Sequence, residues 1–202
     1  MSLLLVGLSL GACDRQSAPA RQDDASKSAP SNAVTPDEVP STPETAGAKS
    51  ASFVIDRSKA GSPLPDFVFA DAKSKDVTLS RFAGRPILVN LWATWCAPCV
   101  AEMPQLDAIA GAYAKDKLAV LTISQDSLGA DKVVPFFQKK GFQHIQPWLD
   151  PENQFGFHYA TGMLPTSVLY TADGKEIARV VGALDWEGDD AKALIEEAVN
   201  GG

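Results

Sequence analysis

The sequence predicts an α/β domain in which a central mixed β-sheet is flanked by helices. Two segments, 86–93 and 118–124, are mostly apolar on both alternating faces, which is typical of strands covered by helices on two sides. A helical pattern follows each of them, and the order strand, helix, strand implies a right-handed parallel crossover. A turn signal at 172–175 between two further apolar segments indicates an antiparallel hairpin, so the sheet is predicted to be mixed.

Composition limits the size and the partners of this domain. The chain has 202 residues, enough for one ordinary domain and a tail, and 45% of them are hydrophobic. Its net charge of −7 argues against nucleic acid and anionic membrane surfaces as main partners. Only three cysteines are present, too few for a disulfide-built scaffold or a two-pair zinc site.

The N-terminal segment 1–13 has the pattern of a signal and lipobox. Its apolar run is far too short to span a bilayer, and it ends in Leu-Gly-Ala-Cys, which resembles the bacterial lipobox whose cysteine becomes acylated. We therefore expect Cys13 to carry a lipid, and Asp14 resembles the residue that retains some lipoproteins in the inner membrane. No Lys or Arg precedes the run, which a start codon upstream of Met1 would explain. The alternative is a hydrophobic leader with a free thiol.

Residues 14–50 are predicted to form a disordered linker. They include seven Ala, six Ser and five Pro and no aromatic residue, so they cannot bury enough surface to offset the entropy of ordering. A flexible coil of this length has ends roughly 30–35 Å apart on average. Such a tether would let a folded domain at 52–200 move over a membrane surface.

Within that domain each element follows from its local pattern. Short strands are expected at 67–70 and 77–79, before the central strand. A helix is expected over 96–114, with Pro98 in its first turn, where the missing N–H is harmless, and with a kink at Pro104.

The second half of the domain continues with a helix over 130–140, closed by Gly141. The hairpin strands are expected at 167–171 and 176–181, and an acidic helix over 185–200 ends the domain. This order of elements is the thioredoxin arrangement.

The chemistry is expected in Trp95-Cys96-Ala97-Pro98-Cys99. A cysteine at a helix start faces unpaired N–H groups, which together with the helix dipole lower a thiol pKa from ~8.5 towards ~7 in such sites. Cys96 is therefore predicted to be the nucleophile, and Cys99, further into the helix, to resolve the mixed disulfide. No cofactor is expected beyond this redox-active Cys96–Cys99 disulfide.

Two other interpretations of the cysteine pair stay open. It could be an inert structural disulfide, or half of a zinc site. No metal is expected, because the remaining candidate ligands are His144, His158 and remote carboxylates at no recognisable spacing. A role for the two histidines in copper binding is a weaker alternative to surface or capping roles.

The chain resembles a known family, the membrane-tethered, thioredoxin-like thiol-disulfide oxidoreductases of the TlpA/ResA group. The resemblance covers roughly residues 61–198, and the ending Gly182–Trp186 is most like that of TlpA-type members. The matching stretches are Gly84–Cys99, Glu102–Pro104, Gly162–Ser167 and Asp173–Gly174.

The resemblance implies roles for two further residues. Pro165 is expected to form a cis peptide with Leu164 and to lie against the sulfurs. Asn90 occupies the strand position at which cytosolic thioredoxins carry a buried acid. Glu102, on the same helical face as Cys99, is therefore assigned the acid/base role with a pKa raised by partial burial; the alternative is a solvated surface glutamate.

Substrate recognition is expected around the nucleophile, with Trp95 touching the substrate. Four tryptophans, at 92, 95, 148 and 186, are candidates for a recognition surface, although Trp148 is favoured for the core. The residues expected to bind substrate are Trp95, Ala97, Pro98, Leu164 and Thr166.

The predicted function is a periplasm-facing reductase of protein disulfides, anchored by lipid to the inner membrane. The Ala97-Pro98 spacer offers no charged or donating side chain, which favours the reducing end of a range that spans ~150 mV, or ~7 kcal/mol for two electrons. The resemblance implies a membrane electron donor of the DsbD/CcdA type. It also implies substrates among apocytochrome c or proteins that assemble the copper site of cytochrome oxidase.

Two rival functions belong to other classes. A thiol peroxidase of the peroxiredoxin type shares the Pro65-Asp66-Phe67 opening but needs a Thr-x-x-Cys loop that Thr94-Trp95-Cys96 does not supply. A non-enzymatic copper-handling module would use the reduced pair as a Cu(I) ligand.

Overall fold

The structure is a computed structural model that describes residues 53–113 and 117–201. The predicted lipobox segment 1–13 with Cys13, and the predicted linker 14–50, lie outside the described residues. In the described ranges, no helix combines the length and hydropathy needed to cross a membrane.

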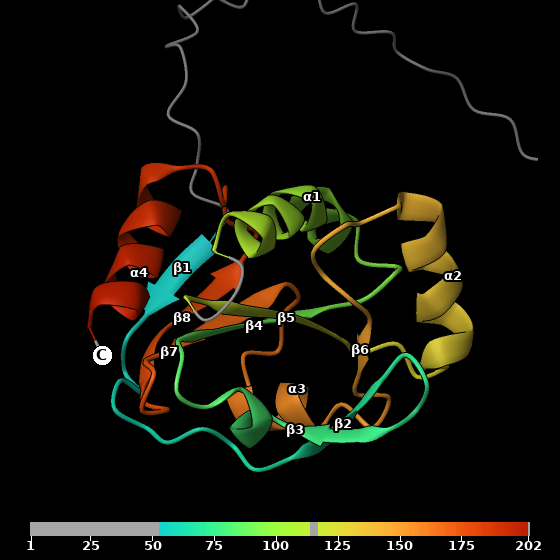
Figure 1. The fold of residues 1–202 in the computed structure, drawn as a ribbon, viewed down its shortest axis with the longest axis horizontal. Coiled ribbons are helices and arrows are strands. Elements are labelled where there is room, and N and C mark those ends of the chain that lie inside the picture. Colours follow the sequence, from blue (N-terminus) through green and yellow to red (C-terminus); the bar gives the residue numbers. More distant parts are fainter. Residues whose placement is uncertain (1–52, 114–116, 202) are drawn as a thin grey trace, which may run out of the picture. The chain divides into compact units, whose positions relative to one another are not determined.

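The described residues form a mixed eight-stranded sheet with helices, which confirms the predicted fold class (Figure 1). The strands are β1 (Phe53–Asp56), β2 (Val68–Asp71), β3 (Asp76–Thr78), β4 (Ile87–Trp92), β5 (Ala119–Ser124), β6 (Trp148–Leu149), β7 (Thr166–Tyr170) and β8 (Glu176–Gly182). The helices are α1 (Ala97–Ala112), α2 (Ala130–Lys140), α3 (Gln154–Tyr159) and α4 (Asp189–Asn200), with a 3-10 turn at Leu79–Phe82.

Strand β4 lies in the middle of the sheet, as its apolar sequence predicts. The strand order is β1-β8-β7-β4-β5-β6-β2-β3. Strand β4 pairs parallel with β5 through the α1 crossover and antiparallel with β7, which forms the predicted hairpin with β8.

Helices cover both faces of this sheet (Figure 1). Helices α1 and α4 pack on the face that carries Leu88 and Leu169, in a core completed by Trp186. The opposite face carries Val89 and is covered by α3. Helix α2 packs beside Trp92 and the two cysteines. The cysteines therefore lie in the hydrophobic cluster between α1 and α2.

Several boundaries differ from the expected ones. Helix α1 runs from Ala97 to Ala112, with Cys96 as its N-cap residue, and is one helix on both sides of Pro104. Helix α4 begins at Asp189 rather than 185, because Gly188 is its N-cap residue and the preceding segment is tied down by the Asp185 carboxylate, which accepts from the Glu187 N–H. The short elements β1, β6 and α3 were not predicted.

A buried ion pair connects β8 to the end of α3. The Arg179 guanidinium donates to both carboxylate oxygens of Glu176 at 2.6 and 3.0 Å. Its third contact, at 2.8 Å, is the carbonyl oxygen of Tyr159, the last residue of α3, whose ring lies under the guanidinium. Both charged side chains are nearly inaccessible to solvent, so each depends on its partner.

The single substitution Arg179→Met is expected to lower the free energy of unfolding by about 3–5 kcal/mol, because it leaves the Glu176 carboxylate buried without its partner. The double variant Glu176→Met/Arg179→Met removes both charges and is expected to recover at least half of that loss. Urea unfolding of the oxidised protein measures both values. A double variant that loses as much stability as Arg179→Met alone would contradict this account.

Candidate active site

The segment before the cysteines is fixed by a carboxylate from the neighbouring strand end. Because β4 and β5 are parallel, their carboxyl ends meet at one edge of the sheet. Asp126, just after β5, accepts hydrogen bonds from the Thr94 N–H at 2.8 Å, the Thr94 hydroxyl at 2.7 Å and the Ser124 hydroxyl at 2.8 Å. No motif predicts this contact, which sets the direction of the chain into Cys96.

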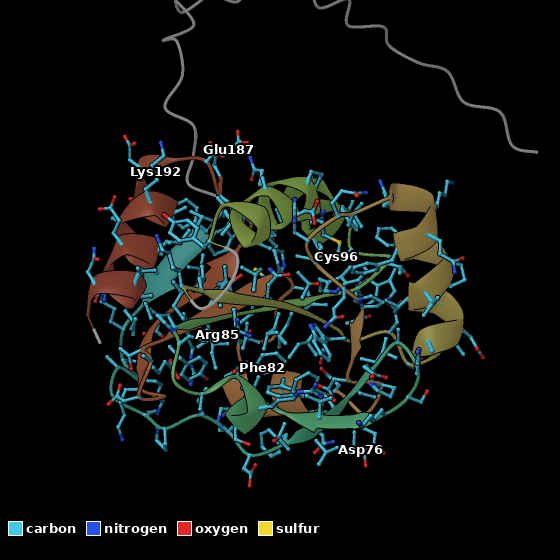
Figure 2. All side chains as sticks on the ribbon, in the orientation of Figure 1. Asp76, Phe82, Arg85, Cys96, Glu187 and Lys192 are labelled. Carbon is cyan, nitrogen blue, oxygen red and sulfur yellow. A yellow bond between two sulfur atoms is a disulfide. The ribbon has the colours of Figure 1, made fainter. Side chains whose placement is uncertain are left out.

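Cys96 and Cys99 form a disulfide at the start of α1, with their Cα atoms 5.3 Å apart (Figure 2). The N–H of Cys99 points at the sulfur of Cys96, 3.3 Å away. This N–H belongs to the first helical turn, whose donors have no partner within the helix. In the reduced protein the same donor would stabilise a thiolate on Cys96 more than a thiol.

The two sulfurs differ in their access to solvent. Cys96 is 6% exposed and lines a surface groove, whereas Cys99 is fully buried among Trp92, Met103 and Val133. An incoming disulfide can therefore reach Cys96 and not Cys99.

A buried carboxyl group lies one turn below Cys99. Glu102 Oε1 accepts from the Asn90 amide at 2.7 Å, and Oε2 accepts from the Trp186 indole at 3.3 Å. The Asn90 amide also donates to the Ser167 hydroxyl at 3.0 Å. Burial raises the pKa of Glu102 to about 7, an effect that hydrogen bonds from Asn90, Trp186 and the Leu184 N–H only partly offset. Glu102 can therefore exchange a proton near neutral pH.

The loop that faces the cysteines ends in a cis peptide bond between Leu164 and Pro165, as the family resemblance implied. Leu164 lines the groove beside Cys96. Thr166 does not: its side chain is buried, and its hydroxyl donates to the Met163 carbonyl at 2.8 Å. Thr166 therefore holds the loop, and its side chain is not available to contact a substrate directly.

The groove has a volume of about 810 Å³ and is lined by four of the five residues expected to bind substrate, Trp95, Ala97, Pro98 and Leu164. Other lining residues were not predicted, among them Gln125, Phe157 and Met163, because no local pattern connects their side chains to the cysteines. The prediction that the tryptophans form a recognition surface is wrong for three of the four. Trp92, Trp148 and Trp186 are buried, which confirms the core placement of Trp148.

The two histidines lie in separate surroundings. His144, in the loop after α2, donates its backbone N–H to the Asp107 carboxylate of α1, and the His158 ring packs edge-on against Phe67. Among residues 53–113 and 117–201, no group of three His, Cys, Asp or Glu side chains is arranged to hold a metal ion.

The chain is similar in sequence to known thiol-disulfide oxidoreductases. The Redoxin family model matches residues 59–195. The thiol-disulfide oxidoreductase ResA of Bacillus subtilis (strain 168) is 32% identical over 125 residues, which cover 61% of this chain and 68% of ResA.

Solved structures share the fold. A putative thiol:disulfide interchange protein DsbE from Chlorobium tepidum superposes with a TM-score of 0.63 at 24% identity, covering 69% of this chain and 97% of that one. The exposed lipoprotein thioredoxin of Streptococcus pneumoniae superposes with a TM-score of 0.57 at 22% identity, covering 65% and 99%.

The raised pKa of Glu102 predicts that stability falls as pH rises from 4.5 to 7. In that range the carboxyl is ionised in the unfolded chain and protonated in the folded one, so unfolding releases a proton. Glu102→Gln removes the effect. The free energy of unfolding of this variant minus that of wild type is expected to increase by about 3 kcal/mol as the pH rises from 4.5 to 8. Urea unfolding of the oxidised proteins at each pH measures the difference.

The matched control is Glu187→Gln, at an exposed carboxyl in the segment next to Trp186. It is expected to keep the wild-type dependence on pH. Equal slopes for wild type and Glu102→Gln would mean that the Glu102 carboxyl titrates normally.

Proposed function

Because this chain belongs to the Redoxin family and is a thiol-disulfide oxidoreductase, we propose that it reduces disulfides in other proteins. The observation that carries the proposal is the unequal access to the two sulfurs. Cys96 opens onto a groove large enough for a polypeptide segment, while Cys99 is enclosed, one helical turn before the buried Glu102. This arrangement suits a nucleophile and a resolving thiol.

In the first step the Cys96 thiolate attacks one sulfur of the target disulfide. A new S–S bond forms between Cys96 and that sulfur, and the other target sulfur leaves as a thiolate that takes a proton from water. The N–H of Cys99 and the dipole of α1 favour the attacking thiolate.

In the second step Cys99 attacks the Cys96 sulfur of the mixed disulfide. Cys99 must lose its proton first, and Glu102 is the base within the same helical face. The second target sulfur leaves and is protonated, so the target gains two electrons and two protons while Cys96–Cys99 becomes the disulfide. A residue that gives and takes protons near pH 7 suits both directions of this exchange.

Electron flow towards the target is favoured by the Ala97-Pro98 spacer. It adds no charge or donor beside Cys96, so the spacer does not stabilise the thiolate further. In strongly oxidising relatives of this fold, the spacer does stabilise it. Leu164, at the groove wall, helps to dock the target chain, and its cis peptide bond to Pro165 turns the backbone at that point.

The proposed setting is the periplasmic face of the inner membrane, with Cys13 as a lipid anchor and a membrane donor of the DsbD/CcdA type returning the electrons. The lipobox-like sequence supports the anchor, and a fold neighbour from Streptococcus pneumoniae is itself an exposed lipoprotein. We further propose substrates among apocytochrome c or the proteins that assemble the copper site of cytochrome oxidase, on the strength of the TlpA-like segments.

Removing the resolving thiol should trap substrates. Cys99→Ser, expressed in the native host, is expected to accumulate mixed disulfides at Cys96, because the second step cannot occur. Non-reducing electrophoresis followed by mass spectrometry identifies the trapped proteins. The control is Cys96→Ser, which is expected to trap little because Cys99 is buried. More adducts on Cys96→Ser than on Cys99→Ser would reverse the assignment of the two sulfurs.

Glu102→Gln is expected to slow the second step by about 10²-fold or more, since general acid–base catalysis contributes on that scale. Rapid-quench measurements should then show the mixed disulfide accumulating, and the inflection near pH 7 in the wild-type rate should disappear. Glu187→Gln serves again as the control. Unchanged resolution kinetics in Glu102→Gln would remove Glu102 from the proton transfer.

A further inference from the structure

Exposed apolar side chains gather around the nucleophile. In the described part of the chain, six large hydrophobic side chains are exposed, and three of them line the groove beside Cys96. These three are Trp95 at 71%, Phe157 at 76% and Met163 at 54% exposure. They come from the loop before α1, from α3 and from the loop before β7, so only the fold brings them together. A clustered exposed apolar surface of this kind marks a binding site.

Phe157 is exposed on helix α3, which is anchored to the rest of the domain by its buried residues. Phe155 and Tyr159, two residues before and after it, are buried in the sheet core. The carbonyl of Tyr159 is held by Arg179, which is itself paired with Glu176. Phe157 therefore projects from an anchored helix, and little conformational entropy is lost when a partner covers it.

The groove is also free of charge. Of the described residues that line it, none but Cys96 carries an ionisable side chain, although the chain as a whole has a net charge of −7. An apolar side chain can enter such a groove without leaving a charged group unpaired. A charged side chain of the ligand would lose water there and find no partner.

We propose that Phe157 and Met163, together with Trp95, select target disulfides whose cysteine is flanked by apolar residues. The occupant is an extended segment of the target protein, with its cysteine at Cys96 and a neighbouring apolar side chain against Phe157 and Met163. This inference rests on the proposed function, since it names the class of substrate for the same site.

The experiment compares three oxidised peptides that differ only beside one cysteine of an internal disulfide. The flanking residues are Leu, Ser or Asp. The reduced full-length protein is mixed with each peptide, the reaction is quenched with acid, and chromatography separates oxidised from reduced peptide. The expected order of kcat/KM is Leu over Ser over Asp, with about a tenfold preference for Leu over Ser.

Phe157→Ala is expected to reduce that preference to about threefold, and Phe157→Leu is expected to restore most of it. The ratio between two peptides is the readout, because a general structural defect would slow both alike. Val54→Ala, at an exposed apolar residue on the edge strand β1, is the control and keeps the full preference.

Each other outcome has a distinct meaning. If wild type reduces none of the peptides, the proposed function fails. If it reduces Leu and Ser peptides equally, or if Phe157→Ala keeps the tenfold preference, the proposed selectivity fails while the function stands. Sedimentation that reveals a dimer of wild type, dissolved by Phe157→Ala, would assign the groove to a second copy and overturn the proposal.

Discussion

The buried carboxyl group of Glu102 fixes the elements around the two cysteines. Its two oxygens accept from Asn90 on β4 and from Trp186 in the segment before α4. These donors lie 12 and 84 residues away in the chain, so one side chain of α1 joins the central strand to the C-terminal part of the domain. A rotation of α1 that moved Cys96 would leave the buried carboxyl and the Trp186 indole N–H without these hydrogen bonds and would remove one of the two hydrogen bonds of the Asn90 amide, which carries a large free-energy penalty.

The same burial explains why this carboxyl suits proton exchange. Three donors favour the ionised form and lower the pKa, but the loss of water outweighs them and leaves it at about 7. A fully solvated glutamate would be ionised at neutral pH and too weak a base to take a proton from a thiol. Stability and chemistry therefore depend on the same contacts, because the donors that hold α1 in place also limit how far the pKa rises.

Most of the sheet was predictable because long apolar segments leave one structural solution. Strands β4 and β5 and helix α2 lie within a residue or two of their expected ranges, and the motif located both cysteines. The contacts that complete the site were not predictable, since each depends on a partner distant in sequence. Local sequence does not say that Trp186 is buried against Glu102 or that Asp126 holds Thr94. Thr166 was expected to bind substrate, and only the structure shows that its side chain is buried and donates to the Met163 carbonyl.

The exposed and buried faces of helix α3 were also not predictable from the sequence. With six residues it completes fewer than two turns, too few for a hydrophobic period to separate its buried face from its exposed one. Phe155, Phe157 and Tyr159 are chemically alike, yet only Phe157 faces the groove. Glu102 is not among the groove-lining residues, so a peptide that covers Cys96 does not touch the carboxyl. The residues proposed for recognition and the carboxyl proposed for proton exchange thus lie apart, so the proposed substrate preference could change through α3 while the carboxyl of α1 keeps its surroundings.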